Sequence, residues 1–287
     1  MFENFIPTVW NETLLRELER VCVYVEDCNR QYEGSVKQKG DEVRILGVGK
    51  PTIKKLARKN ASGKIEGPEE VEDASITMKI DQIRYFNYVV GDIDKAQAVS
   101  GVMEALSKET SEGLANETDT YISDLAVDPT VSSLYGNAPV KAISGDTNAD
   151  GVNVLEILDA AIQKLYENDV NPTTEIVVTV SPRFYTLFKR AYIGKDTDNS
   201  EMLKHGKVAM YGNVTVKMSN NVKRTADGAV DNMMIRTKRA IAFAQPLTHT
   251  EAYRPDDMFA DAVKGYILFG SKIVRPKEML NINVKYA

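Results

Sequence analysis

The residues that most resemble a binding site lie in segment 146–151, Asp-Thr-Asn-Ala-Asp-Gly. Oxygen ligands at its first, third and fifth positions (Asp146, Asn148 and Asp150), followed by glycine, match the opening of an EF-hand calcium loop. The twelfth position should hold a glutamate that binds calcium through both oxygens, but Ile157 stands there and Glu156 comes one residue early. In a helix, this displacement turns the carboxylate about 100° away from the metal.

We therefore favour a simpler interpretation of this segment, an Asx-rich turn that leads into a helix with Asn153 as its N-cap. A calcium-dependent binding module built on Asp146–Gly151 stays as an alternative function. It predicts that calcium raises the melting temperature, and the absence of such a shift would eliminate it.

The other residues that could do chemistry do not form a recognisable catalytic or metal-binding motif. His205 and His249 are far apart and have no Cys, Asp or Glu at the spacing of a zinc site. No Gly-x-Ser-x-Gly element supports a serine nucleophile, and neither Gly47-Val-Gly49 nor Gly206-Lys207 has the context of a phosphate-binding loop. The sequence therefore predicts a protein that is not an enzyme, with no catalytic residues and no cofactor. A hydrolase is the most distant alternative.

The composition excludes several classes of protein. The net charge of −5 argues against a strongly basic nucleic-acid-binding protein. No apolar run approaches the roughly 20 residues needed to cross a bilayer, and the first residues lack the pattern of a secretory signal. We expect a globular protein made in a cytoplasm, without a membrane partner, whose 287 residues suffice for one or two packed cores.

The amino-terminal region combines an extended apolar segment, residues 1–10, with a helix predicted over residues 11–25. Cys22 and Cys28 lie six residues apart in this mostly helical region, and therefore on different faces of a helix. We expect two buried thiols rather than a disulfide or a redox pair.

Residues 32–85 are predicted to form a long two-stranded excursion from the body of the protein, that is, an extended β-hairpin. Its strands are at 43–46 and 76–80, with a polar tip between them. Its charges are sorted by limb, basic on the way out and acidic on the return. Such a hairpin is marginal alone and suited to docking on another subunit, although a solvated loop explains the charges equally well. The candidates for contacts between subunits are Trp10, Lys54, Lys55, Arg58, Lys59, Glu69, Glu70 and Glu72.

The longest helical pattern covers residues 92–126, roughly 50 Å at 1.5 Å per residue, with one face running from Val99 through Leu114 and Glu117 to Leu125. Gly113 could mark a bend or a close approach. A second compact region, 130–235, has predicted helices at 153–168 and 183–192 and strands at 176–180, 208–210 and 214–218. The closing segment, 236–287, is rich in strands.

Short motifs along nearly the whole chain then carry a resemblance to a known family. They include Phe5-Ile-Pro-Thr-Val-Trp10, Arg30-Gln-Tyr-Glu-Gly34 with Lys39-Gly-Asp41, Gly91-Asp-Ile-Asp-Lys-Ala-Gln-Ala98, Asn171-Pro with Val178-Thr-Val-Ser-Pro182, Ser219-Asn-Asn221, Ala240-Ile-Ala-Phe-Ala-Gln245, Glu251-Ala-Tyr-Arg-Pro255, and Ala262-Val-Lys-Gly265 through Arg275-Pro276. Each motif is weak alone, but their order along one chain resembles the major capsid proteins of tailed bacteriophages with the Hong Kong 97 (HK-97-like) capsid fold.

The resemblance implies an α+β fold and a division into named parts: 1–31 as N-arm and first helix, 32–91 as E-loop with its strands, 92–129 as spine helix of the P domain, 130–235 as A domain, and 236–287 as P-domain strands. It also implies a coat protein that self-assembles into hexamers and pentamers of an icosahedral head, localised to the virion after assembly in the host cytoplasm. The implied partners are further copies of the chain, a scaffolding protein, a portal, and double-stranded DNA held without sequence specificity.

Two further points follow from the resemblance. Some relatives join their subunits through Lys–Asn isopeptide bonds, and Lys50, Lys54 and Lys55 lie in the loop, but no specific Lys, Asn and Glu match that chemistry, so we expect no crosslinking. An encapsulin-like compartment shell, which encloses a cargo enzyme, shares the fold and is the nearest alternative function.

Overall fold

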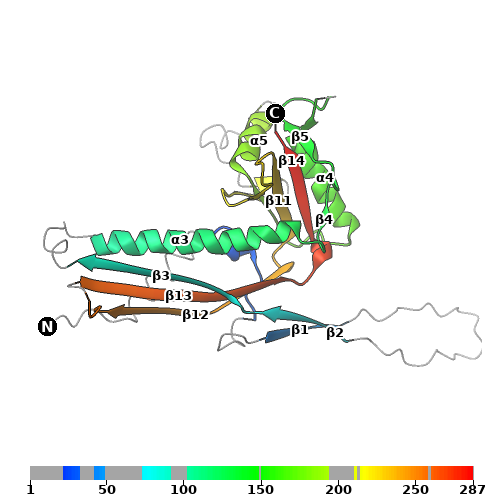
Figure 1. Ribbon diagram of the computed structural model, residues 1–287. Helices are drawn as coiled ribbons and strands as arrows, with labels where there is room; N and C mark the ends of the chain where they lie inside the picture. Colours follow the sequence, from blue (N-terminus) through cyan, green and yellow to red (C-terminus); the bar gives the residue numbers. More distant parts are fainter. Residues whose placement is uncertain are drawn as a thin grey trace, which may run out of the picture.

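The computed structural model describes residues 22–32, 42–48, 73–91, 102–148, 150–193, 210–211, 214–257 and 260–286. Within these residues the chain forms a two-, a three- and a nine-stranded sheet with three α-helices (Figure 1). The longest helix lies along the three-stranded sheet, and its carboxyl end meets the nine-stranded sheet (Figure 1). None of the described helices is long and apolar enough to cross a membrane. The predicted α+β class is confirmed.

The three-stranded sheet is antiparallel, in the order β12-β13-β3. Its strands are β3 (Gln82–Gly91), β12 (Ile241–Tyr253) and β13 (Ala260–Ile273). Helix α3 (Val102–Asp124) covers one face of it, and the buried side chains of Leu114 and Ile122 share a cluster with Ile267 and Phe269. The edge of the Tyr121 ring meets the Phe269 ring at 5.4 Å between centroids. Apolar burial therefore fixes the helix on the sheet.

The predicted two-stranded excursion is confirmed at its base, where β1 (Glu42–Val48) pairs antiparallel with β2 (Asp73–Lys79). Its inner side chains, such as Ile45 and Met78, pack against Ala244 and Leu268 of the three-stranded sheet. Gly270 permits this close crossing, because a Cβ there would overlap the carbonyl oxygen of Lys79.

The nine-stranded sheet has the main order β6-β5-β14-β11-β7-β9-β8, with β10 beside β11 and β4 beside β14. It mixes antiparallel pairs such as β11–β14 with parallel pairs such as β7–β9. Its strands are β4 (Ser132–Ser133), β5 (Val140–Ile143), β6 (Val152–Asn153), β7 (Ile176–Val180), β8 (Met210–Tyr211), β9 (Val214–Met218), β10 (Lys223–Arg224), β11 (Val230–Thr237) and β14 (Met279–Lys285).

Two helices cover one face of this sheet, α4 (Val154–Glu167) and α5 (Pro182–Ile193). Asn153 caps α4 as predicted, because its side-chain oxygen accepts a hydrogen bond from the Leu155 amide at 2.8 Å. Phe184 and Phe188 of α5 are fully buried in the same apolar cluster as the inner face of the sheet. Short 3₁₀ turns, η1 (Val25–Asp27), η3 (Leu125–Val127) and η4 (Pro276–Glu278), complete the described elements.

Three predictions need correction. Residues 22–24 are not helical and Val25–Asp27 form only a 3₁₀ turn, so Cys22 and Cys28 do not share a helix, although both are buried thiols as predicted. Gly113 allows no close approach, because a Cβ there would meet nothing within 4 Å. Helix α3 buries a different face from the one predicted: Glu117 is exposed, whereas the buried positions are Ser107, Ser111, Leu114, Ala115, Thr118, Asp119, Ile122 and Ser123.

The last strand does not join the sheet that contains β12 and β13. Strand β14 pairs with β11 in the nine-stranded sheet, whereas β12 and β13 pair with β3. After β13 the chain therefore passes through residues 274–278 to the nine-stranded sheet, which we call the second unit together with its helices α4 and α5; the three-stranded sheet with α3 is the first unit. The domain boundaries named from the resemblance remain a prediction, and the proposed 236–287 segment contributes to both sheets.

Candidate functional site

The predicted contacts between subunits cannot be placed. Trp10 and the charged residues Lys54, Lys55, Arg58, Lys59, Glu69, Glu70 and Glu72 lie outside the described residues, as do His205 and the lysines considered for crosslinking. These assignments remain predictions. Two other regions of the described chain have the features of functional surfaces, a buried polar junction and an exposed sheet face.

The segment considered for calcium forms a tight turn. Asn148 and Gly151 exchange backbone hydrogen bonds at 3.0 and 3.2 Å, and the Asn148 side chain accepts from the Asp150 amide at 2.8 Å. The Glu156 carboxylate accepts a hydrogen bond from the Thr147 hydroxyl, and Ile157, at the twelfth position, is fully buried. The Asx-turn geometry is as predicted. No group of three or more His, Cys, Asp or Glu side chains converges to hold a metal anywhere in the described residues.

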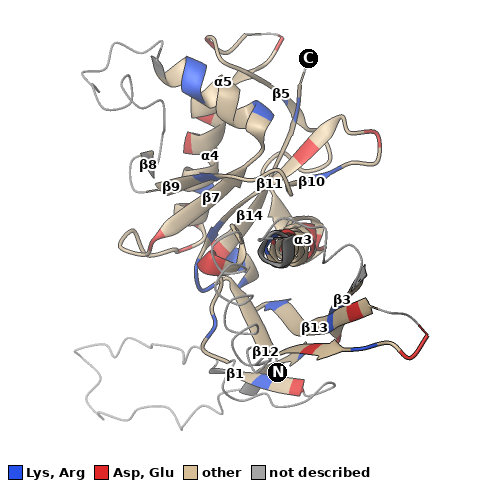
Figure 2. Cartoon of the chain, turned by 90° about the vertical axis from the view of Figure 1, so that its left-hand side faces the viewer, with Lys and Arg blue, Asp and Glu red and all other residues tan. Residues whose placement is uncertain are grey.

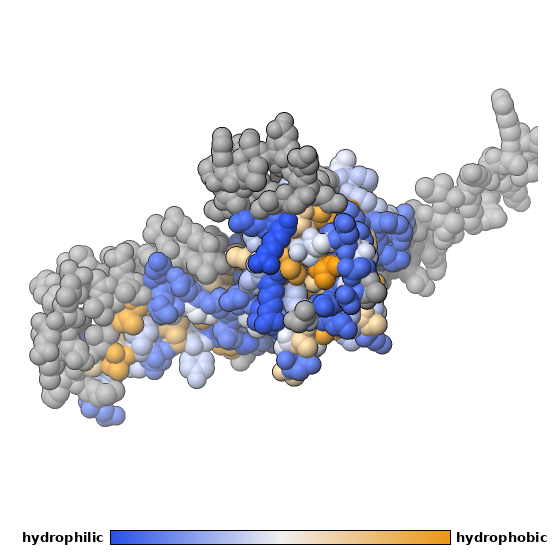
Figure 3. Space-filling view, turned by 90° about the horizontal axis from the view of Figure 1, so that it is seen from above, coloured by the Kyte–Doolittle hydropathy of each residue, from blue (hydrophilic) through white to orange (hydrophobic). Residues whose placement is uncertain are grey.

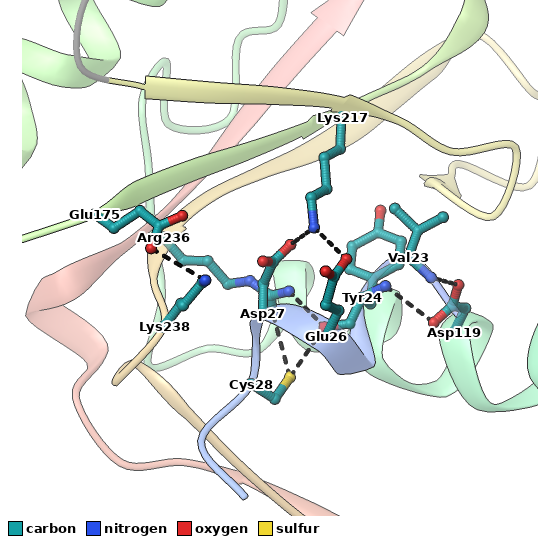
Figure 4. A network of polar contacts seen from close by, with 10 residues as sticks. All are labelled: Val23, Tyr24, Glu26, Asp27, Cys28, Asp119, Glu175, Lys217, Arg236 and Lys238. Carbon is teal, nitrogen blue, oxygen red and sulfur yellow. Dashed lines mark hydrogen bonds and ion pairs between the residues drawn. The ribbon is translucent and has the colours of Figure 1, made fainter. Parts of the chain in front are cut away.

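The polar junction lies where residues 22–28 pass between α3 and the nine-stranded sheet (Figure 4). Asp119 on α3 is 2% exposed, and its two carboxylate oxygens accept hydrogen bonds from the backbone amides of Val23 and Tyr24 at 2.7 and 3.1 Å. A helix side chain thus substitutes for the backbone partners that this non-helical segment lacks. The arrangement fixes the path of residues 22–28 relative to α3.

Arg236 on β11 supports the same segment from the sheet side. Its side chain is 1% exposed, its Nη2 donates to the Tyr24 carbonyl oxygen at 2.8 Å, and its Nη1 donates to the Cys28 sulfur at 3.6 Å. The guanidinium also lies over the Tyr24 ring, 5.6 Å from the ring centroid. Burial of a guanidinium is costly unless a negative charge lies near it and acceptors take up its donors; Asp119 supplies the charge, and the Tyr24 oxygen and the Cys28 sulfur take up two of the donors.

Lys217 on β9 completes the junction. Its Nζ lies 2.7 Å from a Glu26 oxygen and 2.8 Å from an oxygen of Asp27, whose side chain is 2% exposed. The hydrogen bond and the charge of Lys217 hold the pKa of Glu26 below its usual value. The lysine therefore ties residues 26–27 to the nine-stranded sheet, as Asp119 ties residues 23–24 to the helix (Figure 4).

Burial dominates the acid–base properties of the junction. It raises the pKa of the Asp119 carboxyl from 3.8 to about 6, although the amides of Val23 and Tyr24 and the charge of Arg236 oppose that rise. Burial likewise raises the pKa of the Cys28 thiol, so that this sulfur stays protonated at neutral pH. A buried, protonated thiol is a poor nucleophile, and the junction has the chemistry of a structural connection.

The exposed sheet face lies opposite α3 on the three-stranded sheet. Successive side chains of a strand alternate between faces, so Tyr85 and Val89 point away from the helix, and they are 80% and 47% exposed. Tyr85 pairs in register with Tyr266, which pairs with His249, and the last two rings lie 5.7 Å apart. His249 is therefore part of an aromatic row that crosses the sheet. Because these residues adjoin one another across the sheet, they form a continuous exposed surface, and such a surface is a candidate for contact with another protein.

The remaining described surface has no comparable feature. Lys and Arg as well as Asp and Glu occur in both the upper and the lower part of the described chain in this view (Figure 2), and α5 carries basic residues alone, at Arg183, Lys189 and Arg190. Seen from above, the described surface is mostly hydrophilic, with apolar residues in small separate groups (Figure 3).

Comparisons with known proteins agree with this architecture. The chain matches no protein-family model and no curated protein. Among solved structures it resembles a chain titled "Mycobacterium phage Che8", with 25% identity, a TM-score of 0.69, and 91% and 90% of the two chains covered. It resembles the capsid of Cyanophage P-SCSP1u with 15% identity, a TM-score of 0.68 and coverage of 93% and 88%. A virus-like particle from Pyrococcus furiosus matches with 11% identity, a TM-score of 0.57 and coverage of 96% and 98%.

The β1–β2 hairpin, the long helix α3 and the two larger sheets belong to a viral capsid fold, because the likeness to these structures extends over about nine-tenths of each chain. More narrowly, the fold is the HK-97-like one, and the chain resembles the major capsid proteins of tailed bacteriophages, as its motifs predicted.

Proposed function

We propose that this chain is the major capsid protein of a tailed phage, a coat protein that assembles into hexamers and pentamers of an icosahedral head around double-stranded DNA. The observation that carries the proposal is the likeness over nearly the whole chain to phage capsid structures. A likeness confined to one unit would leave the other free for another activity, and no such remainder exists among the described residues.

The exposed sheet face and the hairpin support assembly physically. A two-stranded hairpin has little core of its own, and the described base of this one, β1–β2, is buried against the three-stranded sheet. The row of Tyr85, Tyr266 and His249 offers an apolar and aromatic surface of the kind that contacts between subunits bury. Scaffolding protein and portal are the further partners of such a subunit, and the proposed role is structural rather than enzymatic.

The test is assembly itself. The full chain, expressed with and without the scaffold gene of its genome, should form capsomers or closed shells visible by negative-stain electron microscopy. A chain that stays monomeric under all assembly conditions would refute the proposal.

A second assembly experiment addresses the charged loop. Reversal of Lys54, Lys55, Arg58 and Lys59 to Glu should block assembly with little change in the melting temperature of the monomer. An equal loss of monomer stability would instead mean that the loop packs on its own subunit.

The alternative is a compartment shell that encloses a protein cargo, and the likeness to the virus-like particle from Pyrococcus furiosus favours keeping it. The content of purified shells separates the two functions. A phage head takes up nuclease-protected double-stranded DNA through a portal, whereas a compartment shell forms without scaffold or portal and retains a protein. Portal and terminase genes beside the coding sequence would favour the phage head.

A further inference from the structure

We propose that residues 22–28, here called the strap, dock on the junction and release from it as one unit, and that Asp119 controls the docking. The strap is defined by its contacts rather than by its own structure. Its internal backbone bonds are those of a single 3₁₀ turn, from the Asp27 and Cys28 amides at 3.3 and 3.1 Å. Such an element keeps its shape only while it is held from outside, so it is a natural unit of local opening.

Three elements far apart in the sequence hold the strap from different sides (Figure 4). Asp119 of α3 accepts its amides, Arg236 of β11 donates to its carbonyl, and Lys217 of β9 pairs with its carboxylates. Tyr24 and Val25 add apolar burial against the cluster beneath α3. Beyond the strap, Asn29 exchanges backbone hydrogen bonds of 2.8 and 2.9 Å with Ile241 and Phe243 of β12, which leaves a fixed point about which the strap can turn.

The docked strap is only slightly lower in free energy than the released strap, because docking leaves buried polar atoms without hydrogen-bond partners. The Tyr24 hydroxyl and the Arg236 Nε are buried and have no hydrogen-bond partner among the described residues. Desolvation of such groups and of buried ions opposes the gain from their pairing. Asp119, Asp27 and Arg236, each at most 2% exposed, are charged groups of this kind. Opening of the strap rehydrates all of them at once and withdraws Tyr24 and Val25 from the cluster beneath α3, while the cluster beneath α4 and α5, which contains no strap residue, keeps its packing.

Release would have consequences beyond the junction. The strap is the covalent link between the chain that precedes Cys22 and the chain that leads to β1. While docked, it fixes both to α3 and to the nine-stranded sheet. Once the strap is undocked, its bonds to Asp119, Arg236 and Lys217 no longer fix the points where these two parts of the chain begin. The proposal concerns the isolated subunit and does not rest on shell assembly.

The two cysteines provide the experiment, because both lie in the strap and are buried as thiols. The full chain is pulse-labelled with N-ethylmaleimide at pH 7 under native conditions, and modification of Cys22 and Cys28 is followed by mass spectrometry. Backbone hydrogen exchange at Ile176–Val180, a fully buried strand, reports unfolding of the whole second unit in the same sample. We expect both thiols to react at least about tenfold faster than this strand opens.

The variants test the role of Asp119. Asp119→Ala should accelerate labelling of both cysteines tenfold or more while protection of Ile176–Val180 is retained. The matched control is Asp124→Ala on the same helix, whose exposed carboxylate pairs with Lys223 at 2.8 Å and should leave the rate unchanged. Lys217→Met, which acts from another element, should also accelerate labelling and decides the question if Asp119→Ala does not fold.

Two outcomes would overturn the proposal. In the first, the thiols of the wild-type chain react only as fast as Ile176–Val180 exchanges, which would mean that the strap opens only with global unfolding. In the second, Asp119→Ala and Lys217→Met label no faster than the Asp124→Ala control.

Discussion

Replacement of Asp119 by asparagine should change the pH dependence of stability in a direction that burial dictates. The pKa of Asp119 is raised from 3.8 to about 6 in the folded chain. The folded state therefore binds a proton more tightly than the unfolded state. The stabilisation that results is complete below pH 3.8 and is lost as the pH rises through about 6.

The magnitude follows from that difference. A rise of about two pH units at 1.36 kcal/mol each amounts to about 3 kcal/mol, and the side chain is 2% exposed, so solvent screens little of it. The amide side chain of the Asp119→Asn variant does not titrate in this range, so the stability of the variant lacks this term. Because the unfolded carboxyl is already partly ionised at pH 4, most but not all of this term is present there, and the free energy of unfolding of the wild type relative to Asp119→Asn should be about 2 kcal/mol greater at pH 4 than at pH 7.

Urea unfolding of both proteins at several pH values, followed by circular dichroism, measures this difference. The comparison removes the contribution of other carboxyl groups, such as Glu26 and Glu278, whose lowered pKa values make the whole chain less stable in acid. The reasoning is refuted if the advantage of the wild type is greater at pH 7 than at pH 4. That result would mean that the ionised carboxylate is the better partner for the two amides and that hydrogen bonding outweighs desolvation.

Three further changes test other parts of the structure. Asn153→Ala removes the cap of α4 and should lower the free energy of unfolding by about 1 kcal/mol in urea, with no loss expected for Asn220→Ala on an exposed turn. Gly270→Ala places a Cβ against the Lys79 carbonyl oxygen and should lower the free energy of unfolding in urea by about 1–3 kcal/mol. Gly113→Ala, whose Cβ meets nothing, should raise it by about 1 kcal/mol through the higher helix propensity of alanine. Equal effects of the two substitutions would contradict the close crossing at Gly270. Tyr85→Lys should impair shell assembly in electron micrographs without lowering the melting temperature, and Met218→Lys, an exposed apolar residue of β9, is its control.

Local features of the fold could be predicted because their causes are local. Asn153 stands directly before an amphipathic run, and the apolar alternation of residues 43–46 and 76–80 predicts strands wherever they pair. Strand β14 shows the limit of this reasoning. Its sequence predicts a strand, but the choice between two sheets depends on whether Leu280, Ile282 and Val284 fit the core beneath α4 and α5 better than the one beneath α3.

The junction could not be predicted for a related reason. An aspartate in a helical pattern ordinarily faces solvent, and the partners of Asp119 lie about 95 residues away, at Val23 and Tyr24. One signal was available: Ser107, Ser111, Thr118 and Asp119 recur at helical spacing on one face of α3. A stripe of small polar residues is unusual for a solvent-facing surface of a long helix, where long charged side chains are common. The hydroxyls of Ser111 and Thr118 bond to carbonyl oxygens of α3 itself, so the small size of these residues lets another segment approach the helix, and Asp119 is the member that bonds to that segment.

A polar junction also suits a subunit whose two units must keep a fixed relative orientation. Apolar packing holds α3 on the sheet but is non-directional, whereas hydrogen bonds and ion pairs add a requirement for particular angles. The bonds of Asp119, Arg236 and Lys217 each require a particular direction, and they arrive from α3, β11 and β9. A change in the angle between the two units breaks all three at once and leaves buried charges without partners, which costs several kcal/mol. The junction therefore resists small distortions strongly, while release of the strap removes that resistance in one step.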